Sequence, residues 1–262
     1  MTKRLVCVIG NSHAAMLKAG LELVPGIAET ISFEFFAAQS DLMRNTELRG
    51  TVIAPTTELT KRRIGSFSAG KVEIESADYA EFLVIGLGFN VIKAMDVLKD
   101  HGLFGFEGPE SNIASYISRA CFAAVLESTL RSSTAMHFSR MLRGVSAARI
   151  VVIPQPYPSE KILQGGQSDF WKRAAASGLL EYVAQLYEAT ARRVIAEAGC
   201  EYLPQPPETL QPGPFTQDRF SQDSIRLAKD MNHKHPPAEP YHMNAIFGSE
   251  VLKRYAAMMA RE

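Results

Sequence analysis

LVCVIGNSH, residues 5–13, is the stretch that decides the fold class. Its run of five apolar residues predicts a strand buried on both faces, and the apolar pattern at 14–17 predicts the start of a helix. A strand, a tight turn and a helix in this order place Ser12 at the carboxyl end of a parallel strand. Open α/β sheets bind their ligands at that edge, so this segment predicts a site as well as a sheet.

Ser12 itself has two interpretations. Serine is a preferred N-cap, so Ser12 could simply begin the helix. A serine beside the free backbone N–H groups of a helix N-terminus is also placed for nucleophilic attack, because those groups favour developing negative charge. The turn alone favours the cap, whereas a base elsewhere in the chain would favour the nucleophile.

The rest of the chain continues the alternation of strands and helices. Further strands are predicted at 31–36, 82–85, 150–153 and 201–203. Helices are predicted at 94–100, 113–130, 135–142, 171–198 with a break near Gly178, and 247–260, while 220–230 is partly helical. Residues 40–78 predict loops with a short helix or strand. We therefore predict an α/β fold, a three-layer α/β/α sandwich around a mostly parallel sheet, as a single domain over 1–262.

Composition bounds the class of protein. The 262 residues are 46% hydrophobic and 21% charged, which is typical of a globular protein, and 28 basic residues balance 28 acidic ones. A net charge of zero gives no global field to attract nucleic acid, and the basic run 61–63 is short. No window is long enough to span a membrane and no signal peptide is recognisable, so we expect a cytoplasmic protein without a membrane partner. Three widely separated cysteines without metal spacing predict buried thiols.

A second polar segment, Gly86-Leu87-Gly88-Phe89-Asn90, directly follows the predicted central strand. It leaves the same sheet edge as the Ser12 turn. Glycine permits positive φ and close backbone approach, and an asparagine amide can donate to an oxyanion. The alternative is a glycine turn in which Asn90 caps the next helix.

A third segment precedes the terminal helix and supplies candidates for a base. Glu239 stands three residues before His242, and Asp230 stands three residues before His233. A catalytic histidine needs a partner that fixes its tautomer and stabilises the imidazolium. Either acid-x-x-His pair meets that requirement.

Together these blocks resemble the SGNH (GDSL-type) hydrolases, and the resemblance spans residues 8–248 in the family's order. It implies a flavodoxin-like sandwich and an esterase that forms an acyl-enzyme without a cofactor. Ser12 would be the nucleophile, and its N–H and Asn90 would be oxyanion donors. Gly88 and His13 would line the substrate site.

The same resemblance implies that His242 is the general base and that Glu239 orients it. His242 is preferred to His233 because Asn244 and Gly248 follow it in the family's pattern. Glu239 stands where the family has aspartate, so Asp230 or a backbone carbonyl could orient His242 instead.

Three further positions depart from the family's pattern or stay unassigned. Asn11 and Val91 each stand where the family often has aspartate. The second-block N–H donor is not assigned, with Gly50, Gly65, Gly70 and the loop 37–40 as candidates.

Alternatives remain for the C-terminal residues and for the function. His233, His235 and His242 with an acid could bind zinc, although that would leave Ser12 and Asn90 unexplained, so no metal is expected. An acyltransferase would use the same residues, and a non-catalytic binding protein would not bring them together. The expected partner is a small-molecule or carbohydrate ester, acetyl esters included, and the apolar stripe of the last helix is compatible with a homo-oligomer.

Overall fold

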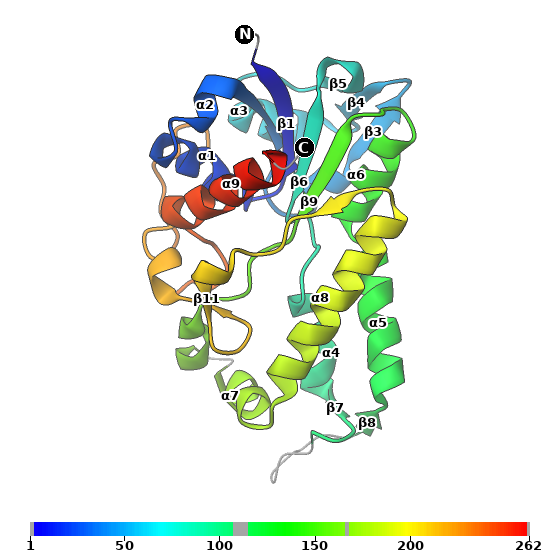
Figure 1. Ribbon diagram of the computed structural model, residues 1–262, viewed down its shortest axis with the longest axis vertical. Coiled ribbons are helices and arrows are strands. Elements are labelled where there is room, and N and C mark those ends of the chain that lie inside the picture. Colours follow the sequence, from blue (N-terminus) through cyan, green and yellow to red (C-terminus); the bar gives the residue numbers. More distant parts are fainter. Residues whose placement is uncertain (1–2, 107–114, 166–167, 261–262) are drawn as a thin grey trace.

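A five-stranded parallel sheet forms the centre of the computed structural model, which describes residues 3–106, 115–165 and 168–260 (Figure 1). Its strand order is β10-β9-β6-β1-β2, and every neighbouring pair in it is parallel. The strands are β1 (Arg4–Gly10), β2 (Ile31–Ala37), β6 (Glu81–Ile85), β9 (Arg149–Ile153) and β10 (Glu201–Tyr202). All five strands lie where the sequence predicts them.

The carboxyl ends of the strands stand level with one another. Gly10 at the end of β1 pairs with Ala37 of β2 and with Ile85 of β6, and Ile85 pairs with Ile153 of β9. Segments that follow these strands therefore leave one edge of the sheet side by side. Ser12 and Asn90 lie in two such segments.

Alternate residues of the strands pack on opposite faces, as expected for a sheet buried on both sides. Val6 and Val8 face a core shared with α1 and α9, whereas Cys7 and Ile9 face a core shared with α4, α5, α6 and α8. The helices are α1 (Ala14–Gly20), α2 (Ile27–Thr30), α3 (Glu58–Phe67), α4 (Ile92–Asp100), α5 (Arg119–Arg131), α6 (Thr134–Arg143), α7 (Ser168–Ala176), α8 (Leu179–Glu197) and α9 (Ala245–Met259).

The segment 40–78 contains more structure than predicted. An antiparallel sheet of order β3-β4-β5 accompanies α3. The smaller strands are β3 (Thr46–Arg49), β4 (Val52–Pro55), β5 (Ile74–Glu75), β7 (His101–Leu103), β8 (Ser115–Ile117), β11 (Leu210–Gln211) and β12 (Phe215–Thr216). These strands have two to four residues each, too few for a periodic signal.

Two helix predictions needed correction and one was confirmed. The helix predicted at 113–130 begins only at Arg119, because Ser118 caps it by accepting a hydrogen bond from the Cys121 N–H. Residues 115–117 form a strand instead, and residues 113–114 lie outside the described residues. The segment 220–230 has one helical turn that ends at Phe220. The predicted break near Gly178 exists, since Gly178 has a φ of 74° between α7 and α8.

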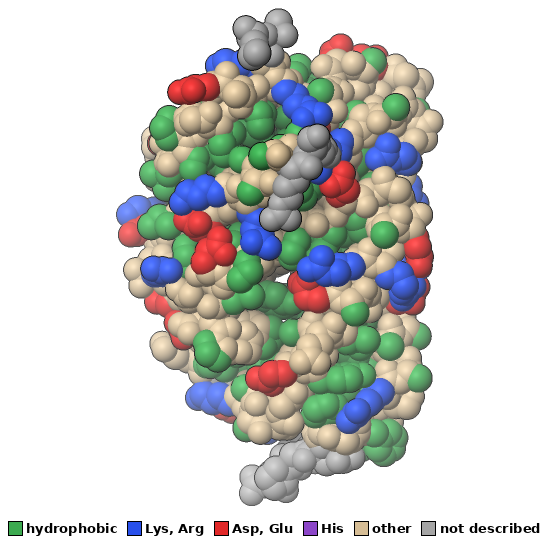
Figure 2. All heavy atoms as spheres, in the orientation of Figure 1, with side chains coloured by type: hydrophobic (Ala, Val, Ile, Leu, Met, Phe, Trp, Pro, Cys, Tyr) green, Lys and Arg blue, Asp and Glu red, His purple; other side chains and the backbone are tan. Residues whose placement is uncertain are grey.

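Charges of both signs are mixed over the face shown in Figure 2, in line with the balanced composition. Among the helices of the described residues, none combines the length and apolarity needed to cross a bilayer. Cys7 and Cys200 are buried, but Cys121 is exposed, contrary to the expectation for all three thiols. Val251 and Tyr255, in the apolar stripe of α9, pack inside the molecule, whereas Ile246 at the start of the helix is 52% exposed.

Candidate functional site

Ser12, His242 and Glu239 form a continuous chain of contacts at the carboxyl edge of the sheet. The Oγ of Ser12 lies 2.8 Å from Nε2 of His242. On the other side of the ring, Nδ1 of His242 lies 3.1 Å from Oε2 of Glu239. The structure thus joins three residues that are 230 positions apart at most, and it selects His242 and Glu239 from the two predicted acid-x-x-His pairs.

The turn after β1 presents Ser12 without using its side chain as a cap. The N-cap of α1 is His13, whose backbone N–H donates to the Oδ1 of Asn11 at 3.2 Å. The backbone N–H of Ser12 has no acceptor among the described residues. The interpretation of Ser12 as a simple N-cap is therefore wrong, and its N–H is available to a ligand.

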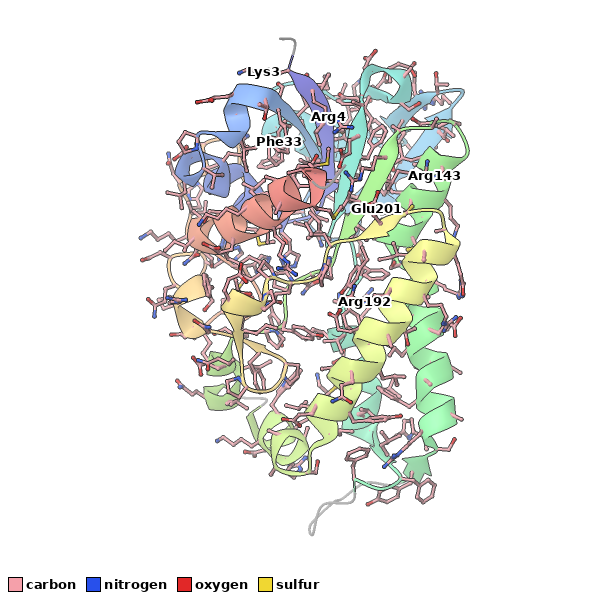
Figure 3. All side chains as sticks on the ribbon, in the orientation of Figure 1. Lys3, Arg4, Phe33, Arg143, Arg192 and Glu201 are labelled. Carbon is pink, nitrogen blue, oxygen red and sulfur yellow. The ribbon has the colours of Figure 1, made fainter. Side chains whose placement is uncertain are left out.

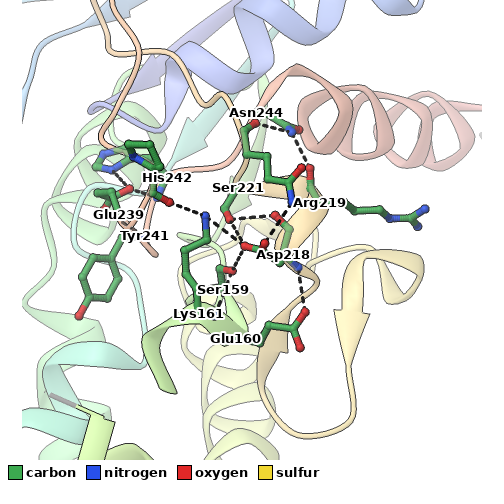
Figure 4. Close-up of polar contacts among 12 residues, drawn as sticks. Ser159, Glu160, Lys161, Asp218, Arg219, Ser221, Glu239, Tyr241, His242 and Asn244 are labelled. Atoms are coloured by element: carbon green, nitrogen blue, oxygen red, sulfur yellow. Dashed lines mark hydrogen bonds and ion pairs between the residues drawn. The ribbon is translucent and has the colours of Figure 1, made fainter. Parts of the chain in front are cut away.

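Hydrogen bonds hold the loop that carries Glu239 and His242 (Figure 4). The Ser159 N–H donates to the Pro240 carbonyl at 2.7 Å, and Nζ of Lys161 donates to the Pro237 carbonyl at 2.9 Å. Lys161 also pairs with Asp218 at 3.1 Å. These contacts anchor the loop on both sides of Glu239.

Asn244 and Gly248 connect this loop to α9, which explains the His-x-Asn-x-x-x-Gly spacing. Oδ1 of Asn244 accepts from the Phe247 N–H at 3.1 Å and so caps α9, while its Nδ2 donates to two carbonyls of the 219–222 turn at 2.8 and 2.9 Å. A Cβ on Gly248 would stand 1.9 Å from the Met16 carbonyl oxygen. Only glycine lets α9 approach α1 this closely, and α1 begins two residues after Ser12.

Glu239 is bound as an ionised carboxylate. Its Oε1 accepts from the Tyr241 N–H at 3.0 Å, and its Oε2 accepts from the His242 N–H at 2.9 Å. Burial raises the pKa of Glu239, but the hydrogen bonds and the charge of His242 outweigh burial and lower that pKa to about 2. The carboxylate thus stays charged beside the His242 ring.

His242 lies in a stack of three imidazoles. The centroid of the His235 ring is 3.9 Å from that of the His242 ring, and the centroid of the His13 ring is 4.9 Å from it. Each of the two rings makes an interplanar angle of 13° with the His242 ring. Burial and the nearby His242 lower the pKa of His13 to about 3 and that of His235 to about 4. Both neighbours are neutral at pH 7.

Asn90 makes two side-chain hydrogen bonds. Its Oδ1 accepts from the Lys93 N–H at 3.2 Å, so Asn90 does support the start of α4, and its Nδ2 donates to Oε1 of Gln155 at 3.0 Å. Gln155 also lies beside the His13 ring, whose pKa it influences, so it stands between Asn90 and the Ser12 turn. An amide Nδ2 has two protons, and one of them is taken by Gln155.

Gln155 and the ring stack on His242 were not predicted. Gln155 lies between two prolines after β9, where the sequence predicts only a rigid exit from the sheet. The order of the strands could have indicated Gln155. It follows β9 as Asn90 follows β6, and these two strands end side by side at the same edge of the sheet. The sequence suggests His235 only as a metal ligand.

Three of the glycine candidates, Gly88, Gly50 and Gly70, adopt the positive φ angles that turns require. Gly86, Leu87 and Gly88 have φ values of 66°, 49° and 76°, so Gly88 belongs to a turn of consecutive left-handed residues. Gly50 and Gly70 also have positive φ, in the turns that flank β4 and α3. The second-block N–H stays unassigned.

The candidate zinc ligands divide into two groups. His233 pairs with Asp230 at 4.0 Å on the surface, whereas His235, Glu239 and His242 offer ligand atoms within 4.8 Å of one another. Zinc lies about 2.0–2.1 Å from an imidazole nitrogen and close to the ring plane. Two rings stacked 3.9 Å apart cannot both direct in-plane lone pairs to one ion. The observed ring arrangement therefore does not fit zinc.

A cavity of about 480 Å³ lies between α8, α9 and the proline-rich loops that follow β9 and β10. Tyr157, Pro204 and Pro214 from these loops line it, and Arg192 of α8 borders the opening (Figure 3). Ser12 and His242 are not part of the wall of this cavity.

Comparisons with known proteins do not assign a family. No protein-family model and no curated protein matches the sequence. Among solved structures, the chain is similar to one described as a gut microbial diltiazem-metabolizing enzyme, with a TM-score of 0.39 and 13% identity. The match covers 98% of this chain and 46% of the other, so the chain spans about half of that protein's length.

Proposed function

We propose that this protein is a serine esterase of the SGNH type, with the three-layer sandwich of that family. The observation that carries the proposal is the chain of contacts from Ser12 through His242 to Glu239, with distances of 2.8 and 3.1 Å. A nucleophile within hydrogen-bond distance of a base, which a third group orients, is the arrangement that activates a serine hydroxyl.

In the first half-reaction, the Ser12 Oγ bonds to the ester carbonyl carbon while its proton passes to Nε2 of His242. Glu239 stabilises the resulting imidazolium through Nδ1. The tetrahedral intermediate then breaks its bond to the alcohol oxygen, which takes the proton from His242. An acyl group remains on Ser12 and the alcohol leaves.

In the second half-reaction, His242 accepts a proton from water as the water oxygen attacks the acyl carbon. The bond to Ser12 then breaks, Ser12 regains its proton from His242, and the acid is released. The negative oxygen of both intermediates would be bound by the free Ser12 N–H and by the Asn90 N–H that Gln155 does not use.

Hydrolysis is favoured over transfer to another alcohol by the partial exposure of the site. Ser12 is half-buried, and the side chains of His242 and Glu239 are 21% and 19% exposed. Water can therefore reach the acyl-enzyme. We propose short acyl esters of small alcohols or sugars as substrates, acetyl esters included.

Hydrolysis of p-nitrophenyl acetate by the wild type and by Ser12→Ala tests the proposal. The wild type should release p-nitrophenol, and Ser12→Ala should lose this activity while its circular dichroism spectrum stays unchanged. Equal rates for the two proteins would contradict a Ser12 nucleophile.

A further inference from the structure

The His235 ring covers one face of the His242 imidazole. The two ring centroids are 3.9 Å apart and the planes differ by 13°. The His13 ring makes a second parallel contact at 4.9 Å. His235 comes from a segment that is otherwise largely exposed, residues 232–238, yet its own ring is half-buried.

Backbone contacts fix the position of His235. Its N–H donates to the Ser224 carbonyl at 2.8 Å, and the Arg226 N–H donates to the His233 carbonyl at 2.6 Å. This antiparallel bridge joins Ile225 to Lys234. Because two prolines follow His235 directly, the segment has little freedom to move the ring away.

The stack supplies a constraint that the hydrogen bond at Nε2 and the ion-pair contact at Nδ1 do not. Contacts at Nε2 and Nδ1 fix two points of the His242 ring, but the ring can still tilt about the line between them. Proton transfer requires the Ser12 oxygen to lie in the ring plane, where the Nε2 lone pair points. Neighbouring rings stacked on His242 oppose that tilt.

The electrostatic setting suits this role. The charged groups that face His235 are Glu239 and Arg226, besides His242 itself, and His235 stays neutral at pH 7. A neutral ring covers the imidazolium without repelling it. The contact therefore persists when His242 takes the proton from Ser12.

We propose that His235 is a positioning residue, which holds the His242 imidazole in the plane needed for proton transfer through its ring face and not through its nitrogens. This inference rests on the proposed esterase function. It assigns a role to a residue outside the Ser-His-acid chain of contacts.

Two variants separate the ring from its nitrogens. His235→Phe keeps a flat ring on His242, whereas His235→Ala removes it. With p-nitrophenyl acetate, His235→Ala should lower kcat about 10- to 100-fold with little change in KM. A misoriented His242 slows proton transfer by roughly this factor but leaves substrate binding intact. His235→Phe should stay within about threefold of the wild type, as should the control His233→Ala, whose side chain is 71% exposed.

Proton NMR gives a readout that does not depend on activity. The Nδ1 proton of His242, whose nitrogen lies 3.1 Å from Oε2 of Glu239, should give a downfield resonance in the wild type and in His235→Phe. In His235→Ala that resonance should broaden through exchange with water, while thermal unfolding shows a folded protein. An unchanged resonance in His235→Ala would overturn the proposal, as would equal loss of kcat in the Phe and Ala variants. If no variant or wild type hydrolyses esters, the NMR result still decides the positioning role, and the esterase proposal alone fails.

Discussion

Gly248 of α9 lies directly against the backbone of Met16 in α1. A Cβ at position 248 would stand 1.9 Å from the Met16 carbonyl oxygen, and a Cβ on Gly20 would stand 2.6 Å from the Gly248 backbone. His242 precedes α9 and Ser12 precedes α1. The close crossing of these two helices therefore determines how the base meets the nucleophile.

Gly248→Ala should destabilise the protein by about 2 kcal/mol or more, since the new methyl group forces the two helices apart. Urea unfolding measures this loss. Gly26→Ala is the matched control, because nothing lies within 4 Å of a Cβ there, and it should change stability little. Equal unfolding midpoints for the two variants would contradict the close crossing.

Glu239→Gln tests the orienting carboxylate. The amide cannot stabilise the imidazolium as a charge does, so kcat should fall about 10²- to 10⁴-fold with the Ser12 turn intact.

The contribution of Glu239 to the stability of the protein should also change with pH. The pKa of Glu239 is about 2 in the folded protein against an ordinary 4.5, so its carboxylate stabilises the fold above pH 4.5 and loses this effect as the pH falls toward 2.

Urea unfolding at pH 7 and at pH 3 checks the second part of that prediction. Wild type should be more stable than Glu239→Gln at pH 7, and the difference should narrow at pH 3. A difference that grows toward acid pH would show that the Glu239 carboxylate is not stabilised in the fold.

Gln155→Leu tests the residue that stands between Asn90 and the Ser12 turn. Leucine has about the size of the glutamine side chain but cannot accept a hydrogen bond from the Asn90 amide. The Asn90 side chain is then no longer held in the orientation that directs its second N–H to the oxyanion. We expect kcat for p-nitrophenyl acetate to fall about 10-fold, less than the roughly 10²-fold expected when Asn90→Ala removes an oxyanion donor. A Gln155→Leu variant with wild-type kcat would show that this hydrogen bond does not affect catalysis.

Glu81→Gln tests a buried carboxyl at the start of β6. Burial raises the pKa of Glu81 and outweighs the opposing effects of the nearby Tyr255 hydroxyl and of the Arg149 charge. The folded protein therefore holds this proton to higher pH than the unfolded chain, so the carboxyl lowers stability as the pH rises above 4.5.

The Gln variant lacks this cost, and its stability relative to wild type should increase from pH 4 to pH 8 in urea unfolding. Glu47→Gln, on a side chain 49% exposed, removes a carboxylate without affecting a buried site and serves as the control for the substitution itself. A constant difference between Glu81→Gln and wild type would show that Glu81 titrates normally.

The sequence contains enough information for the sheet and for the core of the site. Long apolar runs such as 82–85 and 150–153 predict strands because strands buried on both faces must be apolar throughout. Ser12, Glu239 and His242 were predicted because their order along the chain resembles a known family, and the structure places them in contact.

Gln155 and the His235 stack were beyond prediction for a physical reason. Each depends on a tertiary contact between residues far apart in the chain, and neither residue stands in a periodic pattern. The antiparallel strands within 40–78 escaped for another reason: strands such as Thr46–Arg49 are short and partly polar, so they carry no alternation.

Covalent labelling shows whether Ser12 is an activated nucleophile. The wild type, Ser12→Ala and His242→Ala would each be incubated with a fluorophosphonate, and the adduct located by mass spectrometry. We expect one adduct on the peptide that contains Ser12, none in Ser12→Ala, and much slower labelling in His242→Ala. A wild type that stays unlabelled, or an adduct on a different serine, would contradict this expectation.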